Sequence, residues 1–234
     1  MITQSNLTRG WRVLVGTPTS DKKIYCQDDF ISNIKSFSYP HTNLIVDNSE
    51  ERKNYKRIMK DDVNAIHIKP NNKPIYAVLA ESHEELRKYA IRNNFDYLLH
   101  LESDVFPPVD IIQRLLIHNL PIVSAMYMID FGKDSHLMSQ EIEELGSLRE
   151  TRNLKDGQDL ININGGLQKT FHCGLGCVMI RRDVLEQIEF RWEQGATIAP
   201  DGMFAFDTDA LGIQKFIDTS ILCDHRNSDW KITV

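Results

Sequence analysis

Two carboxylates one residue apart, Glu102 and Asp104, follow an apolar run in the stretch DYLLHLESDVFPP, residues 96–108. Side chains at positions i and i+2 of a strand point the same way, and a turn after Ser103 also lets both acids reach one ion. Hard divalent cations such as Mg²⁺ and Mn²⁺ take oxygen ligands, typically one or two carboxylates plus substrate phosphates. The pair therefore suits a metal bound to a diphosphate, although an isolated Glu-x-Asp segment is more often a pair of solvated turn acids.

The acid pair closes one of several apolar runs that alternate with amphipathic stretches. Short apolar runs bounded by glycine or proline are typical of buried strands, and apolar residues three or four apart are typical of helices. We expect strands at 11–16, 43–51, 63–68, 95–102 and 121–128, and helices at 28–37, 77–94 and 109–119. This alternation predicts a doubly wound sheet that is parallel in the first half of the chain.

Ligands of doubly wound sheets bind outside the carboxyl ends of the strands. Thr17, Asp47 and the Glu102/Asp104 pair all fall where an expected strand ends. We therefore expect these side chains to line one edge of the sheet.

The composition is ordinary for an enzyme-sized domain. The chain has 234 residues, of which 41% are hydrophobic and 26% are charged, which is enough for one core but too little for two. The formal net charge of -6 disfavours broad attraction to nucleic acid. Since no apolar run approaches the roughly 20 residues of a spanning helix, we expect a soluble, cytoplasmic domain without a transmembrane segment, at most peripheral to a membrane.

The second half of the chain is less regular. Residues 130–160 are polar, charge-rich and weakly patterned, which fits either a solvated insertion or a lid. The stretch FHCGLGCVMIRRDVLEQIEF, residues 171–190, predicts a glycine-rich turn, a strand at CVMI and a helix that opens at Asp183. Residues 204–225 alternate short apolar runs with acids.

Five segments resemble the GT-A glycosyltransferases. The acid-pair stretch is similar to the family's DxD segment, and VLVGTPTSD and LIVDNSEE resemble its first two strands with their nucleotide-contacting ends. FHCGLGCVMIRRDVLEQI is similar to the segment beside the acceptor site. FDTDALGIQKFIDTSILCDH resembles the closing segment with its catalytic acid and metal-binding histidine. Together the matches span most of residues 11–225 in the family's order.

The resemblance implies a single GT-A-like (Rossmann-like) domain of the α/β class, with a mostly parallel central sheet flanked by helices. We expect a nucleotide-binding half at 1–128 and an acceptor-side half at 129–234. The implied activity is metal-dependent transfer of a sugar from a nucleoside-diphosphate sugar to an acceptor hydroxyl, with inversion. UDP-sugars are the most frequent donors in such families, and the acceptor, a carbohydrate, protein or lipid, is left open.

The resemblance also assigns metal ligands. Asp104 becomes the principal carboxylate ligand of Mn²⁺ or Mg²⁺, Glu102 lies on the metal or the ribose, and His225 completes the metal shell. A divalent cation that bridges the diphosphate oxygens stabilises the charge that develops as the sugar leaves. An imidazole beside carboxylates favours Mn²⁺ somewhat over Mg²⁺.

The nucleotide-sugar site would extend from the acid pair to the first two strands. Asp47 would read the base, flanked by Thr17 and Pro18, and Ser103 lies between the two acids. Many relatives also carry Ala-Arg-Asn in the helix before the acid pair, where the Arg or Asn helps to hold the donor. Here that stretch is Ser82-His83-Glu84, so donor contacts from this helix are not expected to match the family's.

A base must take the proton of the acceptor hydroxyl. Asp207 and Asp209 in FDTD are the candidates, with Asp207 favoured, because a neighbouring acid raises the pKa of one member of a close pair; exposed turn acids are the alternative. Gly174 and Gly176 would let the acceptor or donor sugar approach the main chain, although a tight turn needs glycines for backbone reasons alone.

Two other functions compete with the transferase. Thiolates and imidazoles select zinc, so a structural zinc site in a non-enzymatic interaction module would use His172, Cys173, Cys177, Cys223 and His225. A sugar nucleotidyltransferase would share the sheet and the metal-diphosphate chemistry, but such enzymes usually open with a glycine-rich loop carrying a basic residue, of which GTPTSDKK is a poor version. A sugar-binding relative without catalytic activity also remains open.

Overall fold

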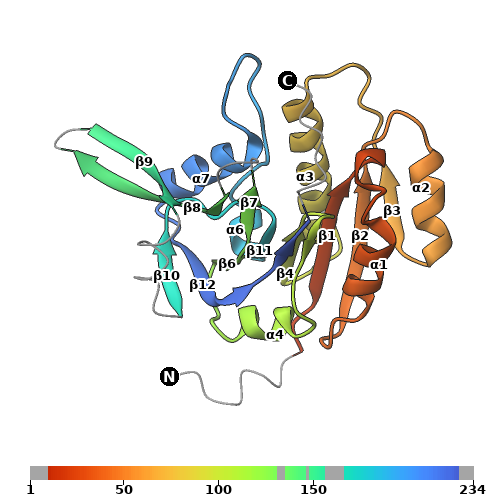
Figure 1. The fold of residues 1–234 in the computed structure, drawn as a ribbon, viewed down its shortest axis with the longest axis horizontal. Helices are drawn as coiled ribbons and strands as arrows, with labels where there is room; N and C mark the ends of the chain where they lie inside the picture. The colour runs from red at the N-terminus through yellow and green to blue at the C-terminus, as the bar shows by residue number, and fades with distance from the viewer. Residues whose placement is uncertain (1–9, 131–134, 146–147, 156–165, 227–234) are drawn as a thin grey trace.

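A single mixed sheet runs through the protein. The structure, a computed structural model, describes residues 10–130, 135–145, 148–155 and 166–226. The strands of this sheet are β1 (Val13–Thr19), β2 (His41–Asp47), β3 (Asn64–His67), β4 (Tyr97–Leu101), β6 (Ile122–Met126), β10 (Leu167–Thr170), β11 (Cys177–Arg181) and β12 (Lys215–Leu222). In the described residues they follow the order β10-β12-β6-β11-β4-β1-β2-β3 (Figure 1).

The half of the sheet built from the first part of the chain is parallel. β1 pairs with β2 and β4, and β2 pairs with β3, all in parallel. β11 then inserts antiparallel to both β4 and β6, while β12 is parallel to β6 and β10 is antiparallel to β12. The sequence prediction of a mostly parallel, doubly wound sheet in a single domain is confirmed.

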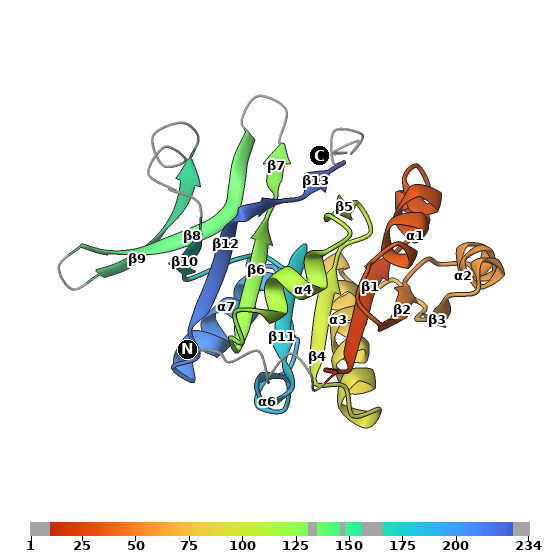
Figure 2. The ribbon, with the colours of Figure 1, turned by 90° about the horizontal axis from the view of Figure 1, so that it is seen from below.

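Helices cover both faces of the sheet (Figures 1 and 2). α1 (Gln27–Lys35), α2 (Lys53–Ile58) and α4 (Ile111–Leu116) pack on one face, and α3 (Ile75–Arg92), α6 (Arg182–Leu185) and α7 (Pro200–Ala210) on the other. Alternate strand residues point to opposite faces, so Val13 and Val15 join one core and Leu14 joins the other. Within the described residues, no helix is long and apolar enough to cross a membrane.

β1 is longer at its carboxyl end than the sequence predicts. It continues past residue 16 to Thr19, so Thr17 and Pro18 lie inside a buried strand and Thr19 reaches the edge opposite Asp47. Pro18 is tolerated because β4 pairs with β1 only as far as Gly16, which leaves no ladder bond for a proline N–H to make.

Two small sheets complete the described fold. β5 (Val105–Phe106) pairs with β13 (Asp224–His225), and β7 (Met128–Asp130) pairs with β8 (Ser135–Leu145), which forms a hairpin with β9 (Leu148–Lys155). The hairpin extends away from the main sheet (Figure 1). It occupies most of the polar segment 130–160, of which 131–134, 146–147 and 156–160 lie outside the described residues. Its role as a lid or an insertion, and the division of the chain at residues 128 and 129, stay predictions.

Two histidines are buried against each other between α3 and β4. The Nδ1 of His100 donates to the Leu175 carbonyl at 2.6 Å, so its Nε2 accepts from His83 Nδ1 at 2.8 Å. Burial lowers the pKa of His100 to about 4, and it also lowers the pKa of His83, with the neighbouring imidazole contributing. The residue in the middle of Ser82-His83-Glu84 is therefore a neutral core group.

This pair predicts acid-sensitive stability. Above the ordinary histidine pKa of 6.5 folded and unfolded chains are both neutral here, whereas below it only the unfolded chain binds the protons readily. The free energy of unfolding should fall by about 2 kcal/mol between pH 7 and pH 5 from His100 alone, measured by urea denaturation. His100→Asn keeps an N–H donor for Leu175 and does not titrate, so it should remove this part of the pH dependence. If the free energy of unfolding depends on pH equally in wild type and His100→Asn, His100 is not the source of the acid sensitivity.

Candidate metal and nucleotide-sugar site

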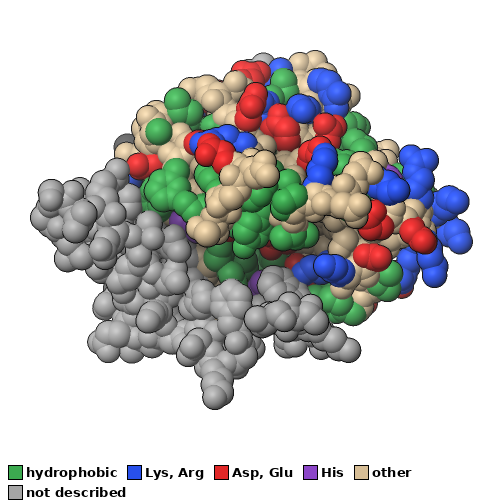
Figure 3. Space-filling model, turned by 90° about the horizontal axis from the view of Figure 1, so that it is seen from above, with side chains coloured by type: hydrophobic (Ala, Val, Ile, Leu, Met, Phe, Trp, Pro, Cys, Tyr) green, Lys and Arg blue, Asp and Glu red, His purple; other side chains and the backbone are tan. Residues whose placement is uncertain are grey.

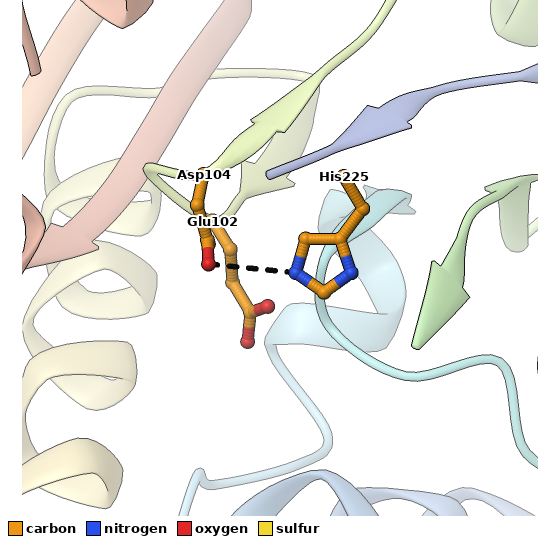
Figure 4. Close-up of side chains that lie close together, drawn as sticks. All are labelled: Glu102, Asp104 and His225. Atoms are coloured by element: carbon orange, nitrogen blue, oxygen red, sulfur yellow. Dashed lines mark ion pairs between the residues drawn. The ribbon is translucent and has the colours of Figure 1, made fainter. Parts of the chain in front are cut away.

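Glu102, Asp104 and His225 converge at the carboxyl end of β4 (Figure 4). Each offers one ligand atom, and these atoms all lie within 4.8 Å of one another. The Nε2 of His225 is 3.4 Å from Asp104 Oδ2. The three residues that the sequence proposed as metal ligands are thus brought together, from positions more than a hundred residues apart.

The turn after β4 and the small β5–β13 sheet create this arrangement. The ladder between β4 and β11 ends at Leu101, the Glu102 N–H donates to the Gly176 carbonyl, and a turn closes where the Val105 N–H donates to the Glu102 carbonyl. β13 then pairs with β5, which sets His225 opposite Val105. The cluster therefore depends on a backbone pairing between distant segments.

Backbone and ring contacts orient the imidazole of His225. Its Nδ1 donates to the Met128 carbonyl at 2.6 Å, which leaves Nε2 as the nitrogen on the side of the acids. The Tyr127 ring packs edge-on against it, with centroids 5.4 Å apart. Metal-bound histidines commonly donate their second N–H to a carbonyl in this way.

The charges of the cluster depend on one another. Burial, with the neighbouring charge of Asp104, raises the pKa of Glu102 to about 7, against the opposing effects of Lys23 and His225. Burial alone would raise the pKa of Asp104, but its contacts with His225 and Lys23 lower it overall. Burial would lower the pKa of His225, and Asp104 outweighs it and raises that pKa. The contacts with His225 and Lys23 thus favour the carboxylate form of Asp104.

These residues fit a divalent cation. Two carboxylates and an imidazole make a mixed oxygen and nitrogen donor set of the kind that accepts Mn²⁺ or Mg²⁺, and the second nitrogen of His225 already has its supporting bond. In the part of the chain that the structure describes, this is the one group of three or more such side chains close enough to share an ion.

The same observation weighs against the zinc module. All five proposed zinc ligands are described, yet no three of them come together in such a group. The four cysteines are buried and free, and burial raises the pKa of the Cys173 thiol to about 11. The expected alternative of a structural zinc site at His172, Cys173, Cys177, Cys223 and His225 is therefore not supported by the described residues.

The expected base-reading residue Asp47 lies at the same edge of the sheet, at the end of β2. Its Oδ1 accepts hydrogen bonds from Ser49 Oγ at 2.6 Å and Asn54 Nδ2 at 2.9 Å. Its buried Oδ2 has no hydrogen-bond partner among the described residues, and neither does the buried hydroxyl of Thr17. Buried polar atoms are usually satisfied, so these two oxygens lack their usual hydrogen bond, although Asp47 Oδ2 lies 3.9 Å from His67 Nε2.

Ser103 links the first strand to the acid pair. Its Oγ accepts from Thr19 Oγ1 at 3.0 Å, and its carbonyl accepts from Cys26 Sγ at 3.4 Å. Pro18 is buried beside them in β1. The nucleotide roles expected for Thr17, Pro18 and Ser103 stay predictions.

Gly174 and Gly176 are pressed against Tyr127. A Cβ on Gly174, which has a φ of +63°, would lie 2.1 Å from the Tyr127 hydroxyl, and a Cβ on Gly176 would lie 2.4 Å from its ring. The Gly176 N–H donates to that hydroxyl at 2.9 Å. The glycines thus have a packing reason of their own, and their contact with a sugar stays a prediction.

The acids of α7 divide into two environments. Both carboxylate oxygens of Asp207 pair with the guanidinium of Arg191, at 2.9 and 2.8 Å, and Asp209 is the second-last residue of the helix. Asp201, which the sequence analysis missed, lies in the first turn, 3.4 Å from His172 Nε2, and its charge contributes to the raised pKa of Glu102. The sequence signal for it is the Pro-Asp-Gly helix start at 200–202.

Figure 3 shows the surface of the protein seen from above. Hydrophobic side chains gather in the middle of this face with small areas of histidine beside them, while Lys and Arg gather at its right-hand edge (Figure 3).

The fold is shared with solved glycosyltransferase structures. The mannosyltransferase PcManGT from Pyrobaculum calidifontis, in complex with GDP-Man and Mn²⁺, is 13% identical over 92% of this chain and 57% of its own, with a TM-score of 0.58. S. aureus TarS 1-349 in complex with UDP-GlcNAc is 9% identical over 94% of this chain and 61% of its own, with a TM-score of 0.55. A mycobacterial protein is 14% identical, covers 93% of this chain and 68% of its own, and has a TM-score of 0.53.

These similarities define the class of fold: the chain has a GT-A-like fold. It spans about three-fifths of the length of the two glycosyltransferase structures. The sequence matches no protein-family model and no curated protein.

The pKa of Glu102 predicts pH-dependent metal binding. A carboxylic acid must lose its proton to bind a metal, and with a pKa of about 7 the ionised fraction of Glu102 rises about tenfold between pH 6 and pH 8. The affinity for Mn²⁺, measured by electron paramagnetic resonance of the free ion, should rise by at least this factor, because His225, whose pKa is also raised, must be neutral to bind the ion. Glu102→Gln should bind Mn²⁺ more weakly and with a shallower pH dependence; an unchanged profile would exclude Glu102 as a ligand.

Proposed function

We propose that the chain is a metal-dependent glycosyltransferase that moves a sugar from a nucleoside-diphosphate sugar to an acceptor hydroxyl, with inversion at the anomeric carbon. The observation that supports this most strongly is the convergence of Glu102, Asp104 and His225 at the carboxyl edge of a GT-A-like sheet. Ligands of open α/β sheets bind at this edge.

The site residues would have two separate roles, metal binding and base recognition. Asp104, His225 and Glu102 would hold Mn²⁺ or Mg²⁺, which when bound neutralises the leaving diphosphate. Asp47 would accept a hydrogen bond from the base through its buried Oδ2. Uracil and guanine offer this oxygen a ring N–H, whereas cytosine and adenine offer an exocyclic amino group beside an acceptor nitrogen.

We also propose Asp201 as the base that takes the proton of the acceptor hydroxyl. Its charge contributes to the raised pKa of Glu102, which supports a role near the metal cluster. Burial would raise its pKa, but the contact with His172 lowers it, so Asp201 is ionised at neutral pH. Asp207, by contrast, would first have to release Arg191.

Nucleotide binding tests the proposed donor class. Thermal denaturation should show stabilisation by UDP or GDP only with Mn²⁺ and not with EDTA. A ligand that binds only the folded state, at 100 times its dissociation constant, raises the free energy of unfolding by about 2.7 kcal/mol. Asp104→Ala should lose the shift, and Asp47→Asn should lose the preference for one base. Absence of any nucleotide shift contradicts the proposal, and pyrophosphate release from a nucleoside triphosphate and a sugar would favour the nucleotidyltransferase.

Two acids of α7 provide a matched test of the base. Asp201→Asn should lower the rate of donor turnover by about 10²–10⁴-fold and leave the nucleotide-induced thermal shift intact. Asp207→Asn breaks the Arg191 pair and should keep most of the rate. The reverse result would assign the base to Asp207, as the sequence segment FDTD first indicated.

A further inference from the structure

Lys23 makes an ion pair with the central acid of the cluster. It lies in η2 (Asp21–Lys23), a 3₁₀ turn directly after β1, and its Nζ is 2.5 Å from Asp104 Oδ2. The lysine side chain is 22% exposed and the Asp104 side chain only 1%. The preceding Lys22 points to solvent. The turn thus delivers one of two adjacent ammonium groups to a buried carboxylate.

The ammonium contacts the oxygen that faces His225. Asp104 Oδ2 is 2.5 Å from Lys23 Nζ and 3.4 Å from His225 Nε2. A divalent cation held between Asp104 and His225 would come within a few ångströms of that ammonium, where like charges repel strongly in a poorly hydrated site. Binding of the ion therefore requires Lys23 to leave Asp104.

Within the described residues, Lys23 is the one Lys or Arg whose ion pair reaches this cluster. α3 offers no charge of that sign on its Ser82-His83-Glu84 segment: His83 is a buried neutral ring, and Glu84 pairs with Arg87 and accepts from the Phe190 N–H. A diphosphate at the cluster would carry several negative charges, and Lys23 is the side chain in position to meet them.

The turn is also tied to the strand that carries His225. The Tyr25 hydroxyl donates to the Arg226 carbonyl at 2.7 Å, and the Arg226 N–H donates to the Asp104 carbonyl at 2.9 Å. These bonds keep the backbone of residues 23–25 beside the site while the long lysine side chain changes its partner.

We propose that Lys23 is an exchangeable counter-ion of this site: it neutralises Asp104 in the metal-free chain, yields the carboxylate to a divalent cation, and then binds the diphosphate of the nucleotide-sugar. The inference rests on the proposed function and adds the residue that couples metal entry to donor binding. It explains how a buried carboxylate is stable before the metal arrives.

Two binding measurements on three variants test this role. Free Mn²⁺ is titrated by electron paramagnetic resonance, and UDP and GDP are titrated by calorimetry at saturating Mn²⁺, on Lys23→Met, Lys23→Arg and the adjacent control Lys22→Met. Lys23→Met should bind Mn²⁺ alone more tightly than wild type, because the competing cation is gone. It should bind the nucleotide about tenfold or more weakly, the usual size of a lost charge-assisted hydrogen bond.

The controls separate this role from a structural one. Lys22→Met should match wild type in both titrations. Lys23→Arg keeps the positive charge, so its affinities for Mn²⁺ and for the nucleotide should stay closer to wild type than those of Lys23→Met. If Lys23→Met matches Lys22→Met, or binds Mn²⁺ more weakly than wild type, the counter-ion role is contradicted but the proposed function is not. If Lys23→Met does not fold, tighter Mn²⁺ binding by Lys23→Gln decides the same point. A wild-type chain that binds neither Mn²⁺ nor a nucleotide contradicts the proposed function and the inference together.

Discussion

Asp104 carries its charge where only 1% of its side chain is exposed, and the site depends on neutralising that charge. An unpaired carboxylate is costly to bury. Lys23 from the turn after β1 and His225 from β13 supply the compensation, and the Arg226 N–H satisfies the Asp104 carbonyl. The first strand, the fourth strand and the end of the described chain are thereby joined at one carboxylate, which makes the same point suitable for a divalent cation.

The regular part of this design could be predicted from the sequence. The buried runs of β1, β2 and β4 are short, apolar and bounded by Gly, Pro or Asn, and α3 shows clear helical spacing, so the parallel half followed from local patterns alone. The ends of elements were harder: β1 runs on to Thr19 because its neighbour β2 continues to pair with it, which is a tertiary effect. The strands β8 and β9 were missed because their sequence is polar, and α7 because its apolar runs are short and interrupted by acids.

The candidate site divides in the same way. Glu102, Asp104 and His225 could be proposed from residue type and resemblance, and the structure brings them together. Asp201 and Lys23 could not, because each owes its place to long-range packing: the first turn of α7 lies against His172, and η2 is tied to Arg226 through Tyr25. Acids at the ends of strands can be recognised in a single sequence. A single charged residue that long-range packing brings to the site, such as Asp201 or Lys23, cannot.

We propose that Asp104, Glu102 and His225 share one divalent cation with a nucleoside diphosphate. Anomalous X-ray scattering at the manganese edge, on crystals grown with Mn²⁺ and UDP or GDP, would locate this ion. We expect one strong peak at about 2.0–2.4 Å from Asp104 and His225, with the diphosphate beside it and Lys23 moved off Asp104. A peak elsewhere, or a nucleotide bound away from Asp104 with Lys23 still paired, would contradict it.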